Sequence, residues 1–333
     1  MRKALIVLAA LAVLWGGAWV AGARALERWV ETWFVETAAG GMQAGYDHVG
    51  VGGFPLRLDL TVERPRLLDP LTLVGWRAEG VRAGVGAFAP NRVVWTLESP
   101  QELVFGPATV GLQAGHLGGE ARLDLLGGLP TALRLEARAL EMQTPEAWPN
   151  EVPAAWRMTL ADGSALLRQG DGDALHLTLD LRDAGLQDAL WPDAVAVRPD
   201  GPVARLAAST TATFDGPPDA GGRMQRLDVE ALELVWGAVR LTGAGVLEVT
   251  DAGWPEGRIA LAAENWQPLV ALAAALHLVE PEIAPTFLRI FETLEEAGET
   301  EGLLEVPLIF HGGRLSFGPL PLGLAPMMAP PRG

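Results

Sequence analysis

After residue 49, apolar and polar residues alternate along much of the chain with a period of two. In segment 54–63 the alternate positions Phe54, Leu56, Leu58, Leu60 and Val62 are apolar, and the residues after Leu56 that lie between them are polar. Successive side chains of a strand point to opposite faces, so this pattern predicts a strand with one buried side. The alternation recurs at Leu123 and Leu125, at 133–138 and at 175–182.

Short turn signals separate these runs, which predicts a largely antiparallel sheet with one apolar and one polar face. The rhythm is densest in segment 224–263, which reads as a meander of three or four strands. The expected turns are Gly118-Gly119, Gly127-Gly128, Asp162-Gly163, Asp171-Gly172 and Gly221-Gly222.

Helical patterns are few in the body of the chain. Segment 266–276 is rich in alanine and leucine, and segment 285–297 has an apolar face opposite three glutamates. Pro285 suits a first helical turn, and Gly298 suits the position after the last one. Strands are expected again at 303–310 and 314–317, before a Pro-rich tail, 319–333, that is extended or disordered.

The best internal linkers are segments 191–202 and 214–222, which are rich in Pro, Asp and Gly. They divide the body into a β-rich region, 40–200, and a second β-rich region with two helices, 201–318. A single continuous curved sheet is the alternative to this division.

The N-terminus carries an apolar run that is long enough to cross a bilayer. Arg2 and Lys3 precede the uncharged segment 4–23. Twenty helical residues span about 30 Å, the thickness of the hydrocarbon core. The two cations predict a cytoplasmic N-terminus, with the rest of the chain on the far side. Trp15 and Trp19 lie toward the outer end of the run, where indoles favour the interface.

The alternative is a cleaved signal peptide, because Ala21-Gly22-Ala23 has the small-x-small form that precedes a cleavage site. The apolar run, however, exceeds the usual ~7–15 residues of such peptides. An amphipathic helix is also predicted over 24–39, with its apolar stripe at Leu26, Trp29, Val30, Trp33 and Phe34. A retained anchor, 1–23, that continues into this helix is the favoured interpretation.

Composition narrows the classes of function. The net charge is −16, and no basic cluster offers a face for phosphates, so nucleic acid is not an expected partner. The absence of cysteine excludes disulfides and thiolate metal sites. It also suits an oxidising compartment.

No catalytic, cofactor-binding or metal-binding residue is predicted, and no cofactor is expected. The five histidines, His48, His116, His176, His277 and His311, show no metal-ligand spacing. Ser99, Ser164, Ser209 and Ser316 lie in no nucleophile motif. The pair Tyr46-Asp47 next to His48 could do acid–base chemistry, but neighbours on an extended chain point in opposite directions.

Twelve tryptophans are many for a chain of this length. Core packing explains them, and an aromatic-lined apolar groove is the alternative. Those expected mostly in strands are Trp76, Trp95, Trp156, Trp236 and Trp266.

Two segments carry a resemblance. One runs from Tyr46-Asp47 to the motif Gly53-Phe54-Pro55-Leu56, and the other covers 310–326, with Phe310-His311-Gly312-Gly313 and a following proline-rich stretch. Together they resemble a bacterial family catalogued as domain of unknown function family 2125, which implies a membrane-anchored envelope protein without an assigned activity. The meander at 224–263 is similar in pattern to AsmA-like envelope proteins, which implies a β-groove for lipid.

The predicted fold is therefore mainly β with a few helices. An N-terminal transmembrane helix is followed by a curved, largely antiparallel sheet or sheets with C-terminal helices. The expected function is that of a non-enzymatic, inner-membrane-tethered periplasmic β-groove module that binds or shuttles lipid or supports envelope assembly. The alternatives are a periplasmic structural or protein-interaction domain with a closed core, and a hydrolase with a dispersed site.

Overall fold

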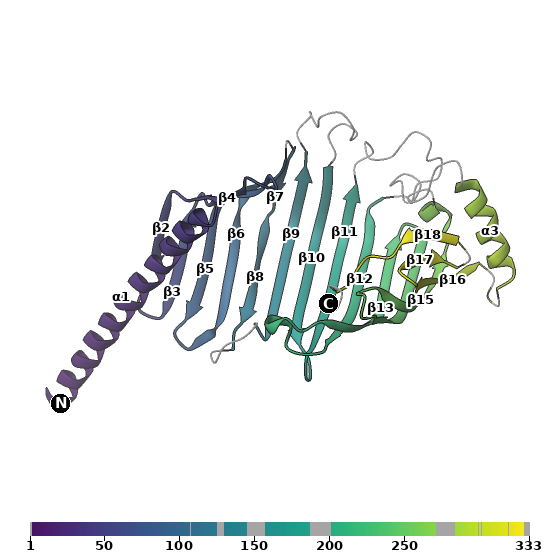
Figure 1. Ribbon diagram of the computed structural model, residues 1–333. Helices are drawn as coiled ribbons and strands as arrows, with labels where there is room; N and C mark the ends of the chain where they lie inside the picture. Colours follow the sequence, from purple (N-terminus) through teal and green to yellow (C-terminus); the bar gives the residue numbers. More distant parts are fainter. Residues whose placement is uncertain are drawn as a thin grey trace. The chain divides into compact units, whose positions relative to one another are not determined.

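The computed structural model describes residues 2–106, 108–124, 130–144, 157–186, 201–270, 284–298, 300, 302–318 and 320–329, with side chains from residue 10 onward (Figure 1). Two compact units are present. The first comprises residues 1–127 and 135–155, and the second comprises 128–134 and 156–333. The strands at 157–186 belong to the second of these units, whereas the two β-rich regions predicted from the sequence meet near residue 200.

The first unit consists of a long helix and an antiparallel sheet. Its elements are α1 (Arg2–Ala39), β1 (Gln43–Gly45), β2 (His48–Gly52), β3 (Arg57–Glu63), β4 (Arg66–Asp69), β5 (Val74–Gly86), β6 (Ala89–Phe105), β7 (Ala108–Gln113), β8 (His116–Arg122) and β9 (Ala132–Gln143), the larger part of which belongs here. The long strands β5 and β6 pair with each other, and each also pairs with two shorter strands on its other side.

Helix α1 is one uninterrupted helix that covers both predicted segments, 1–23 and 24–39, in agreement with their expected continuity. One stripe of it, Ala23, Val30 and Phe34, is buried against the sheet. Phe34 packs on Tyr46 at a ring-centroid distance of 4.7 Å, and Val62 of β3 completes this small core. Each fully buried side chain of this size contributes about 1.5–3 kcal/mol. Of the predicted apolar stripe, Trp29 and Trp33 are exposed, at 64% and 41%.

The contact continues toward the N-terminal end of α1. The indole of Trp15 donates to the carbonyl of Pro55 at 2.8 Å, and that of Trp19 donates to the carbonyl of Arg57 at 2.6 Å. Among the described residues, no helix combines the length and the apolar character needed to cross a membrane. The side chains of the first part of the predicted span, residues 4–9, lie outside the described ones.

The second unit contains an antiparallel meander in which each strand pairs with the next along the chain. Its elements are β10 (Arg157–Gln169), β11 (Ala174–Leu186), β12 (Val203–Phe214), the 3-10 turn η2 (Pro218–Ala220), β13 (Met224–Trp236), β14 (Val239–Val249), β15 (Pro255–Glu264), α3 (Ala284–Glu296), β16 (Leu303–His311), β17 (Arg314–Phe317) and β18 (Leu320–Leu324).

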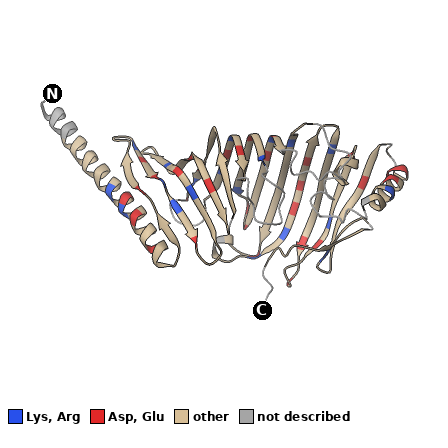
Figure 2. Cartoon of the chain, turned by 90° about the horizontal axis from the view of Figure 1, so that it is seen from above, with Lys and Arg blue, Asp and Glu red and all other residues tan. Residues whose placement is uncertain are grey.

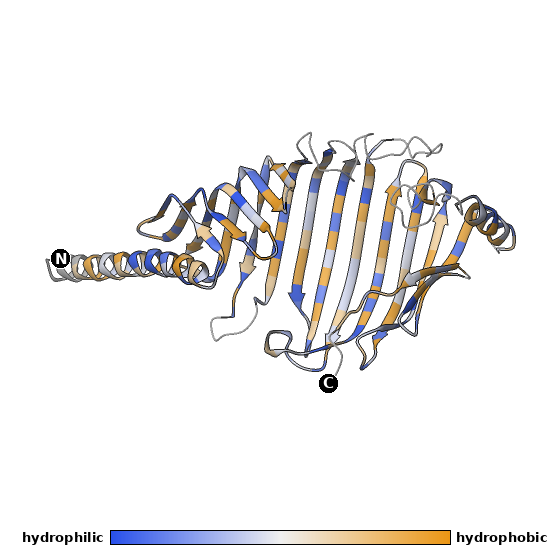
Figure 3. Ribbon diagram, turned by 45° about the horizontal axis from the view of Figure 1, so that its top comes forward, coloured by the Kyte–Doolittle hydropathy of each residue, from blue (hydrophilic) through white to orange (hydrophobic). Residues whose placement is uncertain are grey.

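The mainly β, antiparallel fold with few helices is confirmed, and the alternation of hydropathy along its strands is visible in Figure 3. On β14, the residues Val239, Leu247 and Val249 are buried, whereas every second residue between them is exposed. The strand register places apolar residues of neighbouring strands side by side on this face, since Leu241 pairs with Ala263 and Ala263 pairs with Leu304. The predicted meander at 224–263 therefore corresponds to three strands, β13 to β15.

Two predicted turns are wrong, because both lie inside strands. Gly118-Gly119 belongs to β8, and Asp162-Gly163 belongs to β10. A Cβ atom at Gly118 would approach the carbonyl oxygen of Trp95 to 2.5 Å, so this glycine permits a close approach of β6 rather than a turn. Of the strand expected at Leu123 and Leu125, Leu123 directly follows the end of β8 at Arg122, and Leu125 lies outside the described residues.

The Pro-rich C-terminal segment is packed where it is described. It contains β18, and the buried Ala325 and Ala329 follow that strand. The Met328 amide donates to the Gly253 carbonyl at 2.9 Å. The second half of the helix expected at 266–276, most of the linker at 191–202 and the turn at Gly127-Gly128 lie outside the described residues.

Candidate functional site

An apolar pocket lies within the second unit. Its volume is about 460 Å³, within the range of pockets that hold small ligands. Strands β14, β15 and β16 form its floor, and α3, the helical turn at 267–270 and the pair β17–β18 form its walls. The lining residues are Leu241, Leu261, Ala263, Trp266, Leu269, Val270, Phe287, Phe291, Leu304, Leu315, Phe317 and Leu322.

Helix α3 contributes the aromatic wall of this pocket. Phe287 and Phe291 are spaced by one helical turn, so both point toward the sheet. Phe291 is 3% exposed and makes edge-to-face contacts with Trp266, Phe287 and Phe317, at centroid distances of 5.5, 6.0 and 5.2 Å. The geometry is the favoured one for aromatic pairs.

Trp266 joins this wall to the chain that leaves β15. Its side chain is 2% exposed, and its indole N–H donates to a carboxylate oxygen of Glu295 at 3.0 Å. This bond satisfies the only polar atom of a buried indole. The described lining residues are otherwise hydrocarbon or aromatic, so the pocket is suited to an apolar chain and offers no acid or base.

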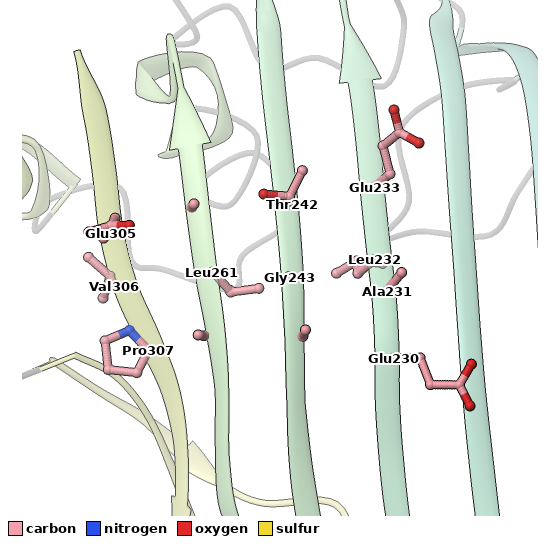
Figure 4. A pocket seen from close by; sticks show the side chains of 13 residues that line it. Glu230, Ala231, Leu232, Glu233, Thr242, Gly243, Leu261, Glu305, Val306 and Pro307 are labelled. Atoms are coloured by element: carbon pink, nitrogen blue, oxygen red, sulfur yellow. The ribbon is translucent and has the colours of Figure 1, made fainter. Parts of the chain in front are cut away.

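The opposite face of the same strands carries a shallow, open trough of about 670 Å³ (Figure 4). Small residues such as Ala244, Ala260 and Ala262 form its floor, and Glu230, Glu233 and Glu305 lie around it. In the part of the chain that the structure describes, no group of three or more His, Asp or Glu side chains could hold a metal ion. The trough therefore offers no ligand set.

A hydrogen-bonded cluster with a histidine lies on this polar face. Ser209 and Thr211 donate to the two carboxylate oxygens of Glu230 at 2.6 and 2.5 Å, and these bonds lower the pKa of Glu230. His176 Nδ1 lies 2.7 Å from the Thr211 oxygen. Since the Thr211 hydrogen is used by Glu230, Nδ1 donates to Thr211. The histidine therefore cannot act as a base toward this hydroxyl, and the cluster links β11, β12 and β13.

Arginines and carboxylates form ion pairs on the rest of this face, most of them between neighbouring strands. Charged residues of both signs recur along the strands in Figure 2. Arg205 bonds Asp180 at 3.1 Å and Glu233 at 2.9 Å, which ties β12 to both of its neighbours. Arg226 bonds Asp228 and Glu248, both at 2.7 Å. Such exposed pairs contribute little individually, and their regular placement specifies strand pairing.

The residues at Tyr46-Asp47 have separate partners. Tyr46 packs on Phe34, while Asp47 accepts hydrogen bonds from Arg64 at 2.6 Å and Arg66 at 3.0 Å. Bonds from Arg64 and then Arg66 lower the pKa of Asp47. The Asp47 carboxylate thereby holds the loop between β1 and β2 against the segment that links β3 to β4. This role is structural.

The other singled-out side chains are dispersed. His311 is hydrogen-bonded to Glu256 at 2.8 Å, while His48 and His116 lie on β2 and β8, and His277 is outside the described residues. Among the tryptophans named for strands, Trp266 lines the pocket and Trp236 is buried, and Trp156 is outside the described residues. The sequence alternation could have suggested the β14–β16 floor, but it could not identify Phe287 or Phe291 as its cover.

Comparison with known protein families gives a match over most of the chain. The family model described as "Uncharacterized protein conserved in bacteria (DUF2125)" matches residues 19–326. No curated protein and no solved structure matches the chain. The similarity in pattern to AsmA-like proteins is not shown by these comparisons and stays a prediction.

Proposed function

The chain belongs to the bacterial family DUF2125, whose description names no activity, and from this premise we propose a function on physical grounds. The protein is a non-enzymatic module, tethered to the inner membrane by α1 with its bulk in the periplasm. Its β-groove binds or shuttles lipid or supports envelope assembly. The apolar pocket under α3 carries this proposal, because about 460 Å³ of hydrocarbon-lined space suits an acyl chain.

The tether is supported by the uncharged segment 4–23 together with the geometry of α1. Ala23 lies in the middle of that helix and is 6% exposed. Cleavage after Ala23 would remove Trp15 and Trp19, and with them one hydrogen bond to Pro55 in the loop before β3 and one to Arg57 at the start of β3. Retention of the segment is therefore part of the proposal. The intact mass of the purified protein checks it.

Photocrosslinking in a membrane tests the proposal. Full-length protein is placed in nanodiscs that contain a phosphatidylethanolamine with a diazirine in its acyl chain, and crosslinked peptides are mapped by mass spectrometry. We expect crosslinks in α1 and also in α3 and β14–β16. Leu322 lies at the pocket rim and is 38% exposed, so Leu322→Trp places an indole in the pocket without disturbing a buried position.

Leu322→Trp should lower the pocket crosslinks about tenfold, the ratio that corresponds to ~1.4 kcal/mol of binding energy. The matched control is Leu324→Trp on the same strand, which is 78% exposed and is not part of the pocket lining. It should leave the crosslinks unchanged. Crosslinks confined to α1 would overturn the lipid groove and favour the closed-core interaction domain. Absence of crosslinks at every position would overturn the tether as well.

The closed-core alternative has one observation in its favour. Helix α3 covers part of the apolar face, and Phe287, Phe291 and Trp266 form a buried cluster there. The same face also carries Leu177 of β11, which is 42% exposed. A single exposed leucine is common on a protein surface, so the choice between the groove and the closed core rests on the crosslinks.

A further inference from the structure

Two turns of the first unit meet at one end of its sheet (Figure 1). The first, residues 53–56, joins β2 to β3, and the second, residues 87–88, joins β5 to β6. The Ala87 amide donates to the Leu56 carbonyl at 2.8 Å, so the turns are in contact. Their apolar side chains point outward: Phe54 is 59% exposed, Leu56 is 50% exposed and Phe88 is 88% exposed. We call these two turns the apolar tip.

The apolar tip is free of charge over a long stretch of sequence. Segments 49–56 and 83–91 contain no Asp, Glu, Lys or Arg, and neither does segment 4–23 of α1. After Arg2 and Lys3, the next charge of α1 is Arg24, partway along the helix (Figure 2). The turn at the other end of β5, residues 70–73, is also uncharged and exposes Leu71 and Leu73. The apolar tip differs from that turn in its hydrogen bonds and ring contact with the uncharged part of α1.

The apolar tip lies beside the part of α1 that is proposed to cross the membrane. Trp15 and Trp19 donate to the carbonyls of Pro55 and Arg57, and Trp19 packs edge-to-face on Phe54 at 5.4 Å. Residues 4–14, the apolar part before these contacts, cover only about 16 Å of helix. The hydrocarbon core is about 30 Å thick. If α1 crosses the bilayer, the level of Trp15 is inside the membrane, and the adjoining turn shares that depth.

Four carbonyl groups of the first turn and its junction with β3 are hydrogen-bonded within the protein. Carbonyl and amide groups in lipid must be hydrogen-bonded within the protein. The carbonyls of Pro55 and Arg57 accept from the two indoles, the Gly53 carbonyl accepts from the Arg57 amide at 2.9 Å, and the Leu56 carbonyl accepts from Ala87. Pro55 has no amide hydrogen to satisfy. Trp15 and Trp19 thus replace water as hydrogen-bond donors.

We propose that the apolar tip, Phe54, Leu56 and Phe88, inserts into the outer leaflet of the same membrane beside α1, so that the first unit is held by three apolar elements. The occupant of this surface is the lipid acyl and glycerol region. The inference rests on the proposed membrane tether and adds a fixed depth and orientation to it. Arg57 and Asp59, an ion pair at 2.9 Å, are the first charges that follow the first turn in sequence.

Depth-dependent quenching tests the insertion. The chain has no cysteine, so single Cys variants can be labelled specifically with an environment-sensitive nitrobenzoxadiazole dye. Phe88→Cys and Leu56→Cys report on the apolar tip, and Leu11→Cys reports on α1. The matched control is Leu71→Cys in the same unit, which is 91% exposed and lies at the other end of β5, about 40 Å away along that strand. Each full-length variant is reconstituted in phosphatidylcholine–phosphatidylglycerol vesicles.

Lipids that carry a doxyl group near the headgroup should quench the dye at Phe88→Cys, Leu56→Cys and Leu11→Cys, and aqueous iodide should quench it at Leu71→Cys. Quenching by the doxyl lipid at Leu11→Cys alone, with Phe88→Cys and Leu56→Cys behaving like Leu71→Cys, overturns the insertion and leaves the tether standing. Loss of lipid quenching at Leu11→Cys as well overturns the tether itself. A fold defect is excluded by the circular dichroism of each variant.

Discussion

The aromatic cluster under α3 predicts a specific cost for the substitution Phe291→Ala. Phe291 is 3% exposed and contacts three other aromatic rings. A buried Phe covers ~150–250 Å², and at ~25 cal/mol per Å² this corresponds to roughly 4–6 kcal/mol, an upper bound. Truncations of this kind cost about 3–5 kcal/mol when measured. We expect a loss in that range for the unfolding free energy of the second unit.

The effect should be measured locally, because a chain of two units need not unfold in one step. Hydrogen exchange of the full-length protein in detergent reports on peptides from β15 and β16, which lie under Phe291. A loss of about 3–5 kcal/mol accelerates their exchange by roughly two to nearly four powers of ten, at ~1.4 kcal/mol per tenfold change. Peptides of β5 and β6 in the first unit should exchange as in the wild type.

Phe88→Ala is the matched control, since it removes the same ring at a position that is 88% exposed. It should change protection by less than about 0.5 kcal/mol. If Phe291→Ala prevents purification, Phe291→Leu keeps most of the volume and should cost below ~1.5 kcal/mol. Less than tenfold faster exchange in Phe291→Ala would refute the assignment of this cluster as the core of the second unit.

Two further predictions concern the first unit. Hydrogen bonds from Arg64 and Arg66 lower the pKa of Asp47 in the folded state. These ion pairs therefore stabilise the fold above the unfolded-state pKa, which is about 3.9. The stabilisation is lost as the pH falls through the folded-state pKa. Asp47→Asn should therefore weaken exchange protection of β1 and β4 at neutral pH, with the difference from the wild type closing in acid; a gap that persists there would contradict this. Gly118→Ala should destabilise the β6–β8 pair by about 1–3 kcal/mol in denaturant titrations, because the new methyl group meets the Trp95 carbonyl. Gly86→Ala, with open space at its Cβ, should leave the stability unchanged. Equal unfolding midpoints for the two variants would argue against a close backbone approach at Gly118.

Much of the architecture could be predicted because it rests on local patterns. The strands β3, β11 and β13–β16 follow from period-two alternation, and α3 follows from its apolar face with Pro285 at its start. Glycine was the misleading signal. Gly118 and Gly163 were predicted as turns, yet both lie within strands. Glycine also occurs in a strand where neighbouring atoms of the same chain leave no room for a side chain.

The candidate sites could not be predicted in the same way. Alternation places Leu241, Ala263 and Leu304 on one face, but nothing local states that α3 covers this stretch of it or that Phe287 and Phe291 form the wall of a pocket. Likewise, Asp47 gives no sign in the sequence that it will bond Arg64 and Arg66. These partners are distant in sequence, and their contacts depend on strand register and packing.

The sequence by itself determined which side chains share a face, where the apolar helix begins and that the sheet is antiparallel, because each follows from short-range periodicity and turn chemistry. Only the tertiary structure decided that one helix, α1, runs from the apolar segment onto the sheet, and that Trp15 and Trp19 bond the turn at Pro55. The physical reason is that burial and hydrogen bonding are settled by what packs on a face, whereas periodicity settles only which face it is.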